Sequence, residues 1–137
     1  MRIIDTPIAD LLVIEPKVWK DDRGYFYESF REDFFKEINI DLSLVQDNQS
    51  LSQKGTIRGL HFQAPPFEQG KLVRVIQGEV LDVVVDIRKS SPSFGKYITN
   101  ILSAKNRKQI WIPEGFAHGF LTLSKTSEFL YKVTSLY

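Results

Sequence analysis

The sequence contains no cysteine and only two histidines among its 137 residues. Without cysteine, a disulfide framework, a zinc–thiolate site and a cysteine nucleophile are all excluded. Its 18 basic and 17 acidic side chains leave a formal charge of +1, so no overall field attracts nucleic acid, and an anionic ligand needs a local cluster of cations. No run approaches the roughly 20 apolar residues of a membrane span. The sequence therefore predicts neither nucleic-acid nor membrane partners.

The N-terminal stretch MRIIDTPIADLL has an acidic residue at position 5 and no long apolar core. It therefore predicts no signal peptide, and we expect a cytoplasmic protein. A chain of this length buries about two-thirds of its unfolded surface when it folds. Since no linker, repeat or low-complexity tract interrupts it, residues 1–137 are predicted to form a single domain.

Most of the chain has the residue alternation and turn spacing of β-strands. A polar turn, KDDRG, separates LLVIEPKVW from YFYESF, and the clusters KSSPSFG and SAKNRK separate later strand-like runs. Short, regular intervals of this kind are typical of a β-sandwich or β-barrel. The pattern predicts a mainly β protein.

One short helix is expected in the N-terminal half. Ser29 and Glu32 have the spacing of a capping box. The apolar residues that recur on one helical face are Phe30, Phe34, Phe35 and Ile38. The pattern predicts a helix of about three turns that ends near Asn39.

The run KLVRVIQGEVLDVVVDIR carries two carboxylates among valines. Gly78 divides it into a hairpin or bends one strand. Beyond the glycine, Asp82 and Asp86 share a face with Val80 and Val84 by the period of two. Acidic residues in a sheet are more often solvated than buried. We interpret this face as solvent-exposed, with the wall of a polar cavity as the alternative.

The run RGLHFQ places one histidine in a predicted strand. His61 and Gln63 share a face by strict alternation, whereas Arg58 falls on the opposite face. A bulge at Gly59 would return Arg58 to the side of His61, where Lys71 would add a second cation. That arrangement suits an anionic, oxygen-rich ligand and proton transfer. The alternative is a hydrogen-bonded core histidine beside surface charges.

Six segments of the chain, taken together, carry a resemblance to a known family. They are DDRGYFYESF, VQDNQSLS, IRGLHFQAPP, QGKLVRVIQGEVLDVVVDIRKSSPSFGK, WIPEGFAHGF and LYKVTSLY. In this order and near this spacing they resemble the dTDP-4-dehydrorhamnose 3,5-epimerase family of deoxysugar nucleotide synthesis. The resemblance implies a cupin-like β-jelly roll, a double-sheet barrel, that forms a homodimer.

The resemblance also implies an isomerase without cofactor or metal. Its substrate would be dTDP-4-dehydro-6-deoxy-D-glucose, inverted at C3 and C5 beside the 4-keto group for dTDP-L-rhamnose biosynthesis. His61 matches the family's general base, Tyr131 the proton donor on the opposite face, and Lys71 a lysine near the 4-keto oxygen. The chemistry is consistent, because removing a proton next to a ketone requires stabilisation of the developing enolate oxygen.

A set of ligand-holding residues follows from the same resemblance. Those in the segment that is expected to act across the dimer are Arg23, Phe26 and Glu28. The others are Gln46, Asp47, Asn48, Arg58, Gln63, His118 and the terminal Tyr137, which matches an aromatic that stacks on thymine. Guanidinium groups offer paired donors to a diphosphate. Taken alone, Arg23 and Glu28 fit an exposed ion pair equally well, and Gln46 and Asn48 fit a turn.

Family members continue beyond the residue that matches Tyr137, and their additional segment supplies an aspartate that hydrogen-bonds the basic histidine. We therefore expect a chain that is C-terminally short relative to the family. It would be a fragment, a short variant in which another acid such as Asp82 substitutes, or an inactive relative. Asp86 is the second candidate for orienting a histidine.

Three other functions compete with a two-position epimerase. One is an epimerase that acts at C3 alone, and another is a non-catalytic relative that binds sugar nucleotides. The third is a metal-dependent cupin that would hold its ion with His61, His118 and a carboxylate.

Overall fold

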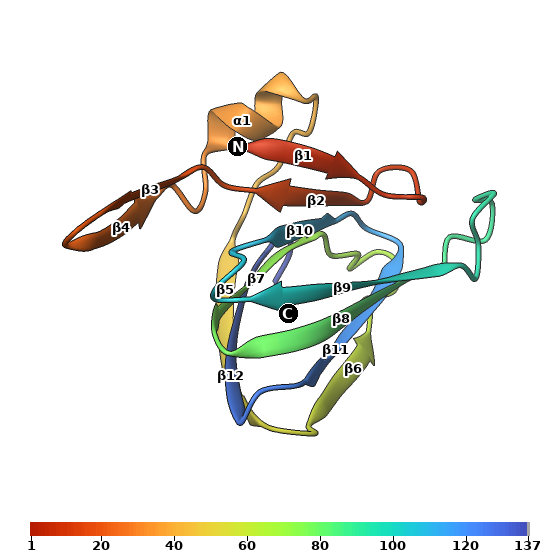
Figure 1. Ribbon diagram of the computed structural model, residues 1–137. Coiled ribbons are helices and arrows are strands. Elements are labelled where there is room, and N and C mark those ends of the chain that lie inside the picture. The colour runs from red at the N-terminus through yellow and green to blue at the C-terminus, as the bar shows by residue number, and fades with distance from the viewer. Residues whose placement is uncertain (137) are drawn as a thin grey trace.

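The computed structural model describes residues 1–136, and strands dominate it (Figure 1). The helix α1 spans Glu32–Glu37. The strands are β1 (Arg2–Asp5), β2 (Leu12–Glu15), β3 (Val18–Asp21), β4 (Gly24–Tyr27), β5 (Gln46–Gln53), β6 (Ile57–His61), β7 (Lys71–Gln77), β8 (Glu79–Asp86), β9 (Tyr97–Ser103), β10 (Gln109–Ile112), β11 (Phe116–Thr122) and β12 (Thr126–Val133). The prediction of a mainly β chain with one short helix is confirmed, but the predicted length of about three turns is wrong, because α1 has only six residues.

Two antiparallel sheets face each other across the core. One has six strands in the order β1-β2-β10-β7-β12-β5, and the other has four in the order β6-β11-β8-β9. Figure 1 shows β5 and β12 of the first sheet on one side and β6 and β11 of the second sheet on the other. Inward-facing side chains from both sheets, among them Val73, Val84, Ile110 and Phe129, form one buried cluster. This is the double-sheet barrel that the sequence predicts.

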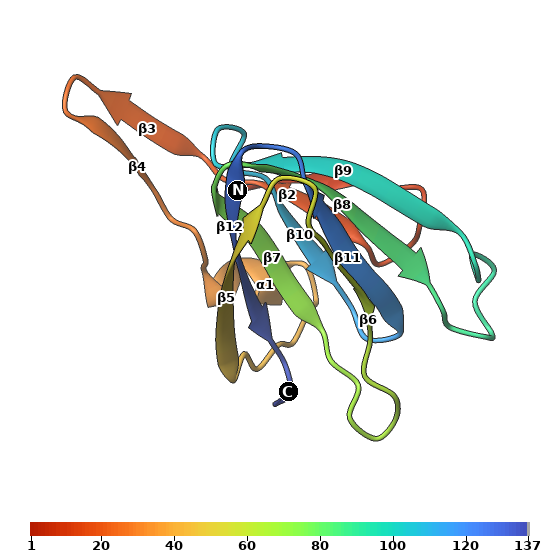
Figure 2. The same ribbon diagram turned by 90° about the horizontal axis from the view of Figure 1, so that it is seen from below.

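The hairpin of β3 and β4 projects from the barrel instead of joining either sheet (Figures 1 and 2). Its two strands pair only with each other among the described residues, from Val18↔Tyr27 to Asp21↔Gly24. Two arginines contact its tyrosines: the Arg107 guanidinium lies 4.1 Å from the ring centroid of Tyr25, and Arg74 donates to the Tyr27 hydroxyl at 3.2 Å. The hairpin is thus attached to the barrel through two tyrosines of β4, while the Arg23 side chain in its turn is exposed.

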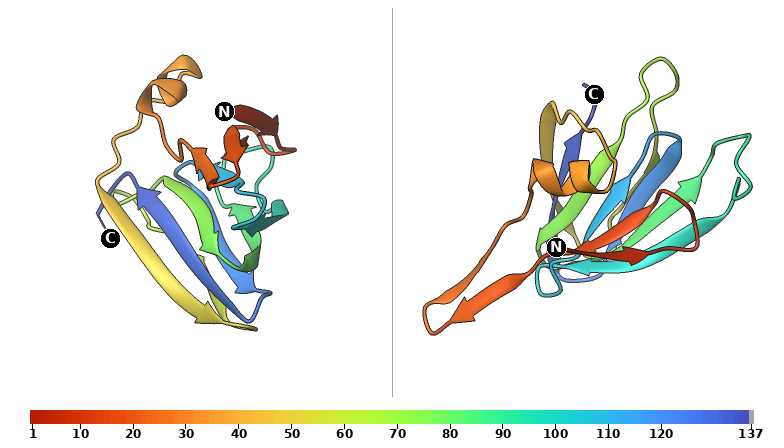
Figure 3. Two further views of the ribbon diagram at one scale, coloured as in Figure 1. Left: turned by 60° about the vertical axis from the view of Figure 1, so that its left-hand side comes forward. Right: turned by 90° about the horizontal axis from the view of Figure 1, so that it is seen from above.

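Helix α1 packs on the outer face of the six-stranded sheet (Figure 3). Phe35 is buried against Ile14, Leu72 and Trp111, so the predicted apolar face is confirmed. The predicted capping box is wrong. The residue before the helix is Arg31, which binds the carboxylates of Glu28 and Asp33, and no side chain caps the first turn.

The face of β8 that carries both aspartates is buried, so its interpretation as solvent-exposed is wrong. Asp82 and Asp86 are 1% and 0% exposed. Both are tolerated because each has partners: Asp82 contacts His118, and Asp86 accepts hydrogen bonds from Arg88, Ser91 and Ser93. Burial alone raises the pKa of Asp86, but those hydrogen bonds outweigh it and hold the pKa below its usual range.

No helix in residues 1–136 has the length and apolarity needed to cross a membrane.

Replacing Asp86 with asparagine should destabilise the protein by about 3 kcal/mol near neutral pH, because Arg88 loses its buried partner charge. A carboxylate whose pKa is lowered by folding stabilises the protein above its unfolded pKa of about 3.9, and this contribution is lost as the pH falls. The difference between wild type and Asp86→Asn should therefore narrow below about pH 4. Urea unfolding across pH measures this, with exposed Asp33→Asn as the control. A difference independent of pH would contradict the ionic role of Asp86.

Candidate active site

A cavity of about 300 Å³ lies between the two sheets. Strands of both sheets line it, with β5, β7 and β12 on one side and β6 and β11 on the other. Its polar lining includes Asn48, Arg58, His61, Lys71, His118 and Tyr131. The cavity therefore combines several cations and titratable groups within a mainly apolar fold.

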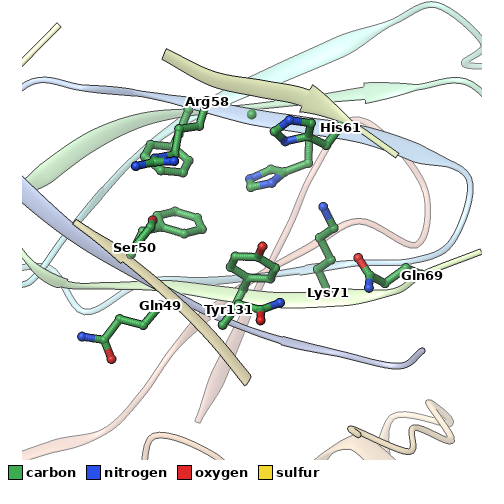
Figure 4. Close-up of a pocket in the computed structure, with 12 residues that line it drawn as sticks. Gln49, Ser50, Arg58, His61, Gln69, Lys71 and Tyr131 are labelled. Carbon is green, nitrogen blue, oxygen red and sulfur yellow. The ribbon is translucent and has the colours of Figure 1, made fainter. Parts of the chain in front are cut away.

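Arg58 and His61 enter the cavity from the edge strand β6 (Figure 4). His118 of β11 pairs with His61 and Phe120 pairs with Arg58, so β6 takes three steps where β11 takes two. This irregularity is the predicted bulge, and it brings Arg58 to the side of His61. The guanidinium is held by Ser52 Oγ, which accepts from Nε at 2.8 Å.

Gly59 makes this bulge possible for two reasons. Its φ of +120° lies in a region that residues with a Cβ rarely adopt. In addition, a Cβ at this position would lie 2.6 Å from the Gly119 Cα and 2.7 Å from the His118 carbonyl oxygen. The absence of a side chain thus lets β6 approach β11 closely enough to pair with it.

Tyr131 and Lys71 reach the cavity from the facing sheet. In Figure 4 the Tyr131 hydroxyl and the Lys71 ammonium both point across the cavity toward the wall that carries His61. The Lys71 nitrogen lies 5.5 Å from the centroid of the Tyr131 ring. The imidazole and the phenol are therefore on opposite walls of one cavity, with the ammonium on the phenol side.

The ammonium of Lys71 is largely removed from solvent, with 9% of the residue exposed. Burial lowers the pKa of Lys71, and the negative charge of Asp82 offsets part of that shift. A desolvated cation interacts strongly with any negative charge that develops nearby. Lys71 is thus suited to stabilise an oxyanion in the cavity.

Asp82 lies behind the cavity wall and contacts His118, with 2.6 Å between Oδ2 and Nε2. Asp82 contacts a histidine, in agreement with the expectation that Asp82 or Asp86 orients one, but that histidine is His118, and Asp86 binds Arg88. The idea that Asp82 takes the place of the family's aspartate at His61 is wrong. Within residues 1–136 no carboxylate hydrogen-bonds His61. The Asp82–His118 pair was not anticipated, although both residues face inward on neighbouring strands whose register pairs Asp82 with Phe120.

Residues of β5 behave differently according to the face on which they lie. Asn48 lines the cavity, and Gln46 donates to its side-chain oxygen at 2.9 Å. Asp47 lies on the other face and binds Lys132, with 3.0 Å between Oδ1 and Nζ. Gln63 is also outside the lining and donates to the Phe67 carbonyl at 2.6 Å.

The hairpin residues Arg23, Phe26 and Glu28 do not line this cavity. Arg23 binds Asp21 at 2.6 Å and its side chain is 87% exposed, while Glu28 binds Arg31 at 3.2 Å. Phe26 is 65% exposed. Tyr137 lies outside the described residues.

Sequence reasoning missed several contributors to the lining. They are Gln49, Ser50, Gln69, Gly119, Phe120 and Phe129. The rings of Phe120 and Phe129 stack with centroids 4.2 Å apart and form an apolar part of the wall. The alternation of β11 and β12 places both inward, but these strands belong to different sheets, and only the packing of the two sheets against each other brings the rings together.

Within residues 1–136, no three His, Cys, Asp or Glu side chains are grouped so that they could hold a metal ion. The Nε2 atom of His118 is engaged by Asp82.

The fold and the cavity together define a cupin-like protein with acid–base groups on facing walls. Residues 5–137 match the family described as dTDP-4-dehydrorhamnose 3,5-epimerase. The chain belongs to this family.

Two relatives show how close the similarity is. The dTDP-4-dehydrorhamnose 3,5-epimerase of Shigella flexneri is 56% identical over 138 residues, which cover 100% of this chain and 76% of that protein. The dTDP-6-deoxy-D-glucose-3,5-epimerase RmlC of Legionella pneumophila, solved with dTDP-4-keto-L-rhamnose, is 53% identical with a TM-score of 0.96. That match covers 99% of this chain and 72% of the Legionella chain.

A more distant structure is a histidine-to-asparagine, tyrosine-to-phenylalanine double mutant of ChmJ, a 3'-monoepimerase from Streptomyces bikiniensis, in complex with dTDP. It is 29% identical, with a TM-score of 0.91 over 97% of this chain and 67% of that chain.

Gly59→Ala should destabilise the protein by about 3 kcal/mol or more, since the new methyl group meets backbone atoms as well as an unfavourable φ. Gly55→Ala is the matched control: Gly55 also has a positive φ, but no atom lies within 4 Å of its added Cβ. The control should lose only about 1 kcal/mol. Denaturant unfolding measures both. Equal losses would show that the contact with β11 does not require glycine.

Proposed function

We propose that this chain is a cofactor-independent isomerase that inverts C3 and C5 of dTDP-4-dehydro-6-deoxy-D-glucose, the 3,5-epimerase step of dTDP-L-rhamnose biosynthesis. One observation carries the proposal: His61 and Tyr131 line one cavity from opposite sheets, with Lys71 beside the tyrosine. Epimerisation needs a base on one face of the sugar and an acid on the other. The names of the relatives agree with this chemistry.

In the proposed reaction, His61 removes the proton from a carbon next to the ketone. The electron pair of that C–H bond moves to the C4 oxygen and forms an enolate. Tyr131 then gives its hydroxyl proton to the same carbon from the opposite face, and the electrons return to restore the ketone. An imidazole suits proton abstraction as a general base, and a phenol is a weak acid that suits donation to a basic carbon.

Lys71 supplies the electrostatic part of the mechanism. Its ammonium is already desolvated and lies in the cavity, 5.5 Å from the centroid of the Tyr131 ring, before substrate arrives. A preorganised cation of this kind stabilises the enolate oxygen more than it stabilises the neutral ketone. Burial lowers the pKa of Lys71. The negative charge of the enolate acts in the opposite direction and stabilises the protonated lysine.

His61 is exposed on the edge strand. The proton that it removes is therefore able to exchange with water before the next cycle. Substrate-dependent exchange with solvent is thus the direct test of the proposal.

In D2O, wild-type protein should incorporate deuterium at C3 and C5 of the substrate. NMR that resolves the two positions measures this incorporation. His61→Asn should reduce exchange at both carbons by about 100-fold or more, because the base is lost. Tyr131→Phe should keep exchange but lose inversion, since abstraction survives and opposite-face donation does not. His61 is exposed, so thermal unfolding should confirm that His61→Asn remains folded.

The same experiment separates the alternatives. Exchange that persists at the wild-type rate in His61→Asn would remove His61 from the mechanism. Exchange at C3 alone would identify a single-position epimerase, the activity that the more distant ChmJ structure is named for. Binding of dTDP without exchange at either carbon would identify a non-catalytic relative.

The nucleotide would be held by Arg58 and by Arg23 of a second copy of the chain. Arg58 lines the cavity, and its guanidinium is oriented by Ser52 and the Leu51 carbonyl. Arg23 and Phe26 belong to a hairpin that extends away from its own barrel (Figure 3), and Glu28 follows the hairpin directly. A hairpin held through β4 and exposed in its turn suits insertion into a partner. We therefore propose a two-fold dimer in which each hairpin completes the partner's cavity.

Exposed apolar residues support an interface of this kind. The outer side of the four-stranded sheet carries Ile57 at 73% exposure, Tyr97 at 67% and Ile101 at 43%. A contiguous apolar surface on a soluble domain commonly marks an interaction site. A single domain spanning residues 1–137, a cytoplasmic location and stacking of Tyr137 on thymine stay predictions.

Mixing two inactive variants tests the shared site. His61→Asn and Arg23→Ala should each be at least tenfold less active alone. After co-expression with different tags, half of the sites in the mixed dimer would combine an intact cavity with an intact hairpin. The purified mixed dimer should therefore have roughly half of wild-type activity, and the unseparated mixture, in which about half of the dimers are mixed, roughly a quarter. A monomer in sedimentation, or no recovery in purified mixed dimers, would contradict the crossing hairpin.

A further inference from the structure

One buried carboxylate stands behind two residues of the cavity wall. Asp82 is 1% exposed and is not part of the lining, yet its Oδ2 lies 2.6 Å from His118 Nε2. Its negative charge also acts on Lys71, where it opposes the effect of burial. His118 and Lys71 both line the cavity. Asp82 thus acts on one residue of each wall: it contacts His118 on β11, and its charge acts on Lys71 on β7.

The contact with His118 selects one form of the imidazole ring. A carboxylate only accepts hydrogen bonds, so Nε2 carries the hydrogen that is shared with Asp82. In the neutral ring, Nδ1 is then the nitrogen with a free lone pair. Within residues 1–136 no hydrogen bond to His118 Nδ1 is formed. This nitrogen remains available to a hydroxyl group of a ligand in the cavity.

The ring is also held in position by its neighbours. The His118 and Phe129 rings stack with centroids 5.8 Å apart and an interplanar angle of 28°. Asp82 and His118 lie on β8 and β11, which are paired along seven consecutive positions from Phe116↔Asp86 to Thr122↔Val80. Side chains on inner, paired strands are placed more accurately than those on loops. The pair is thus preorganised before a ligand binds.

The second oxygen of Asp82 indicates that the carboxylate is not there for stability. Oδ1 is buried and has no hydrogen-bond partner in the described part of the chain. A buried charge with an unsatisfied oxygen costs free energy. Asp86 lies on the same face of the same strand, and both of its carboxylate oxygens accept hydrogen bonds, from Arg88, Ser91 and Ser93. The two carboxylates therefore have different roles.

We propose that Asp82 is a positioning residue of the epimerase site: it holds His118 as the Nε2–H tautomer. His118 then presents Nδ1 to a sugar hydroxyl, while Lys71 faces the ketone oxygen. The inference rests on the proposed function for its catalytic consequence but not for the tautomer. In this arrangement Asp82 acts through His118 and touches no substrate.

The test compares Asp82→Asn with Asp86→Asn, a buried carboxylate on the same strand face. Imidazole ¹⁵N NMR reports the tautomer, and with two histidines in the chain the His61→Asn spectrum assigns His118. Wild type should show the Nε2–H form. Asp82→Asn should disturb it and lower kcat about 100-fold, while the KM for substrate changes less than about threefold. Asp86→Asn should lose stability but retain the His118 signals and kcat.

Several outcomes would overturn the proposal. An Nδ1–H tautomer in wild type refutes it even if Asp82→Asn fails to fold. A normal kcat in Asp82→Asn would also refute it. An equal loss of kcat in Asp82→Asn and Asp86→Asn at matched stability would show that the role of Asp82 is structural. If wild type lacks deuterium exchange altogether, the proposed function fails, whereas the tautomer measurement on the dTDP complex still tests the positioning role.

Discussion

The bulge in β6 is the constraint on which the site depends. Regular alternation would point Arg58 and His61 to opposite faces of the strand, so that only one of them could reach the cavity. One additional residue in β6 relative to β11 places both on the cavity side. The bulge in turn depends on two glycines in contact, Gly59 and Gly119, which allow the backbones to approach. The backbone conformation of β6 thus determines that Arg58 and His61 both face the cavity.

The two walls of the cavity offer different environments. His61 lies on an exposed edge strand, whereas Lys71 is buried on an inner strand of the six-stranded sheet. A base that passes protons to water benefits from solvent contact. A cation that stabilises an enolate benefits from the low dielectric of the interior, where its charge is poorly screened. The asymmetry of the two sheets provides both conditions within one cavity.

Local patterns in the sequence predicted those features that are set by neighbouring residues. The bulge followed from a glycine between Arg58 and His61, and the apolar face of α1 followed from the spacing of its phenylalanines. The burial of Asp82 did not follow, because its partner His118 is 36 positions away and a strand pattern does not reveal which face has partners. The capping box at Ser29 failed for a similar reason: Arg31 forms ion pairs with flanking carboxylates, and the helix begins after it.

The positions of the ligand residues divide into two groups with different physical origins. Asn48, Arg58, Lys71, His118 and Tyr131 converge because strand register places them on the inner faces of two sheets. Arg23 lies in the turn, and Phe26 on β4, of a hairpin whose strands pair only with each other in residues 1–136. The Phe26 ring contacts Trp19 of the same hairpin and remains largely exposed. An isolated two-stranded hairpin is marginally stable in water, so contacts with a second barrel would stabilise the same segment that they bring to the site.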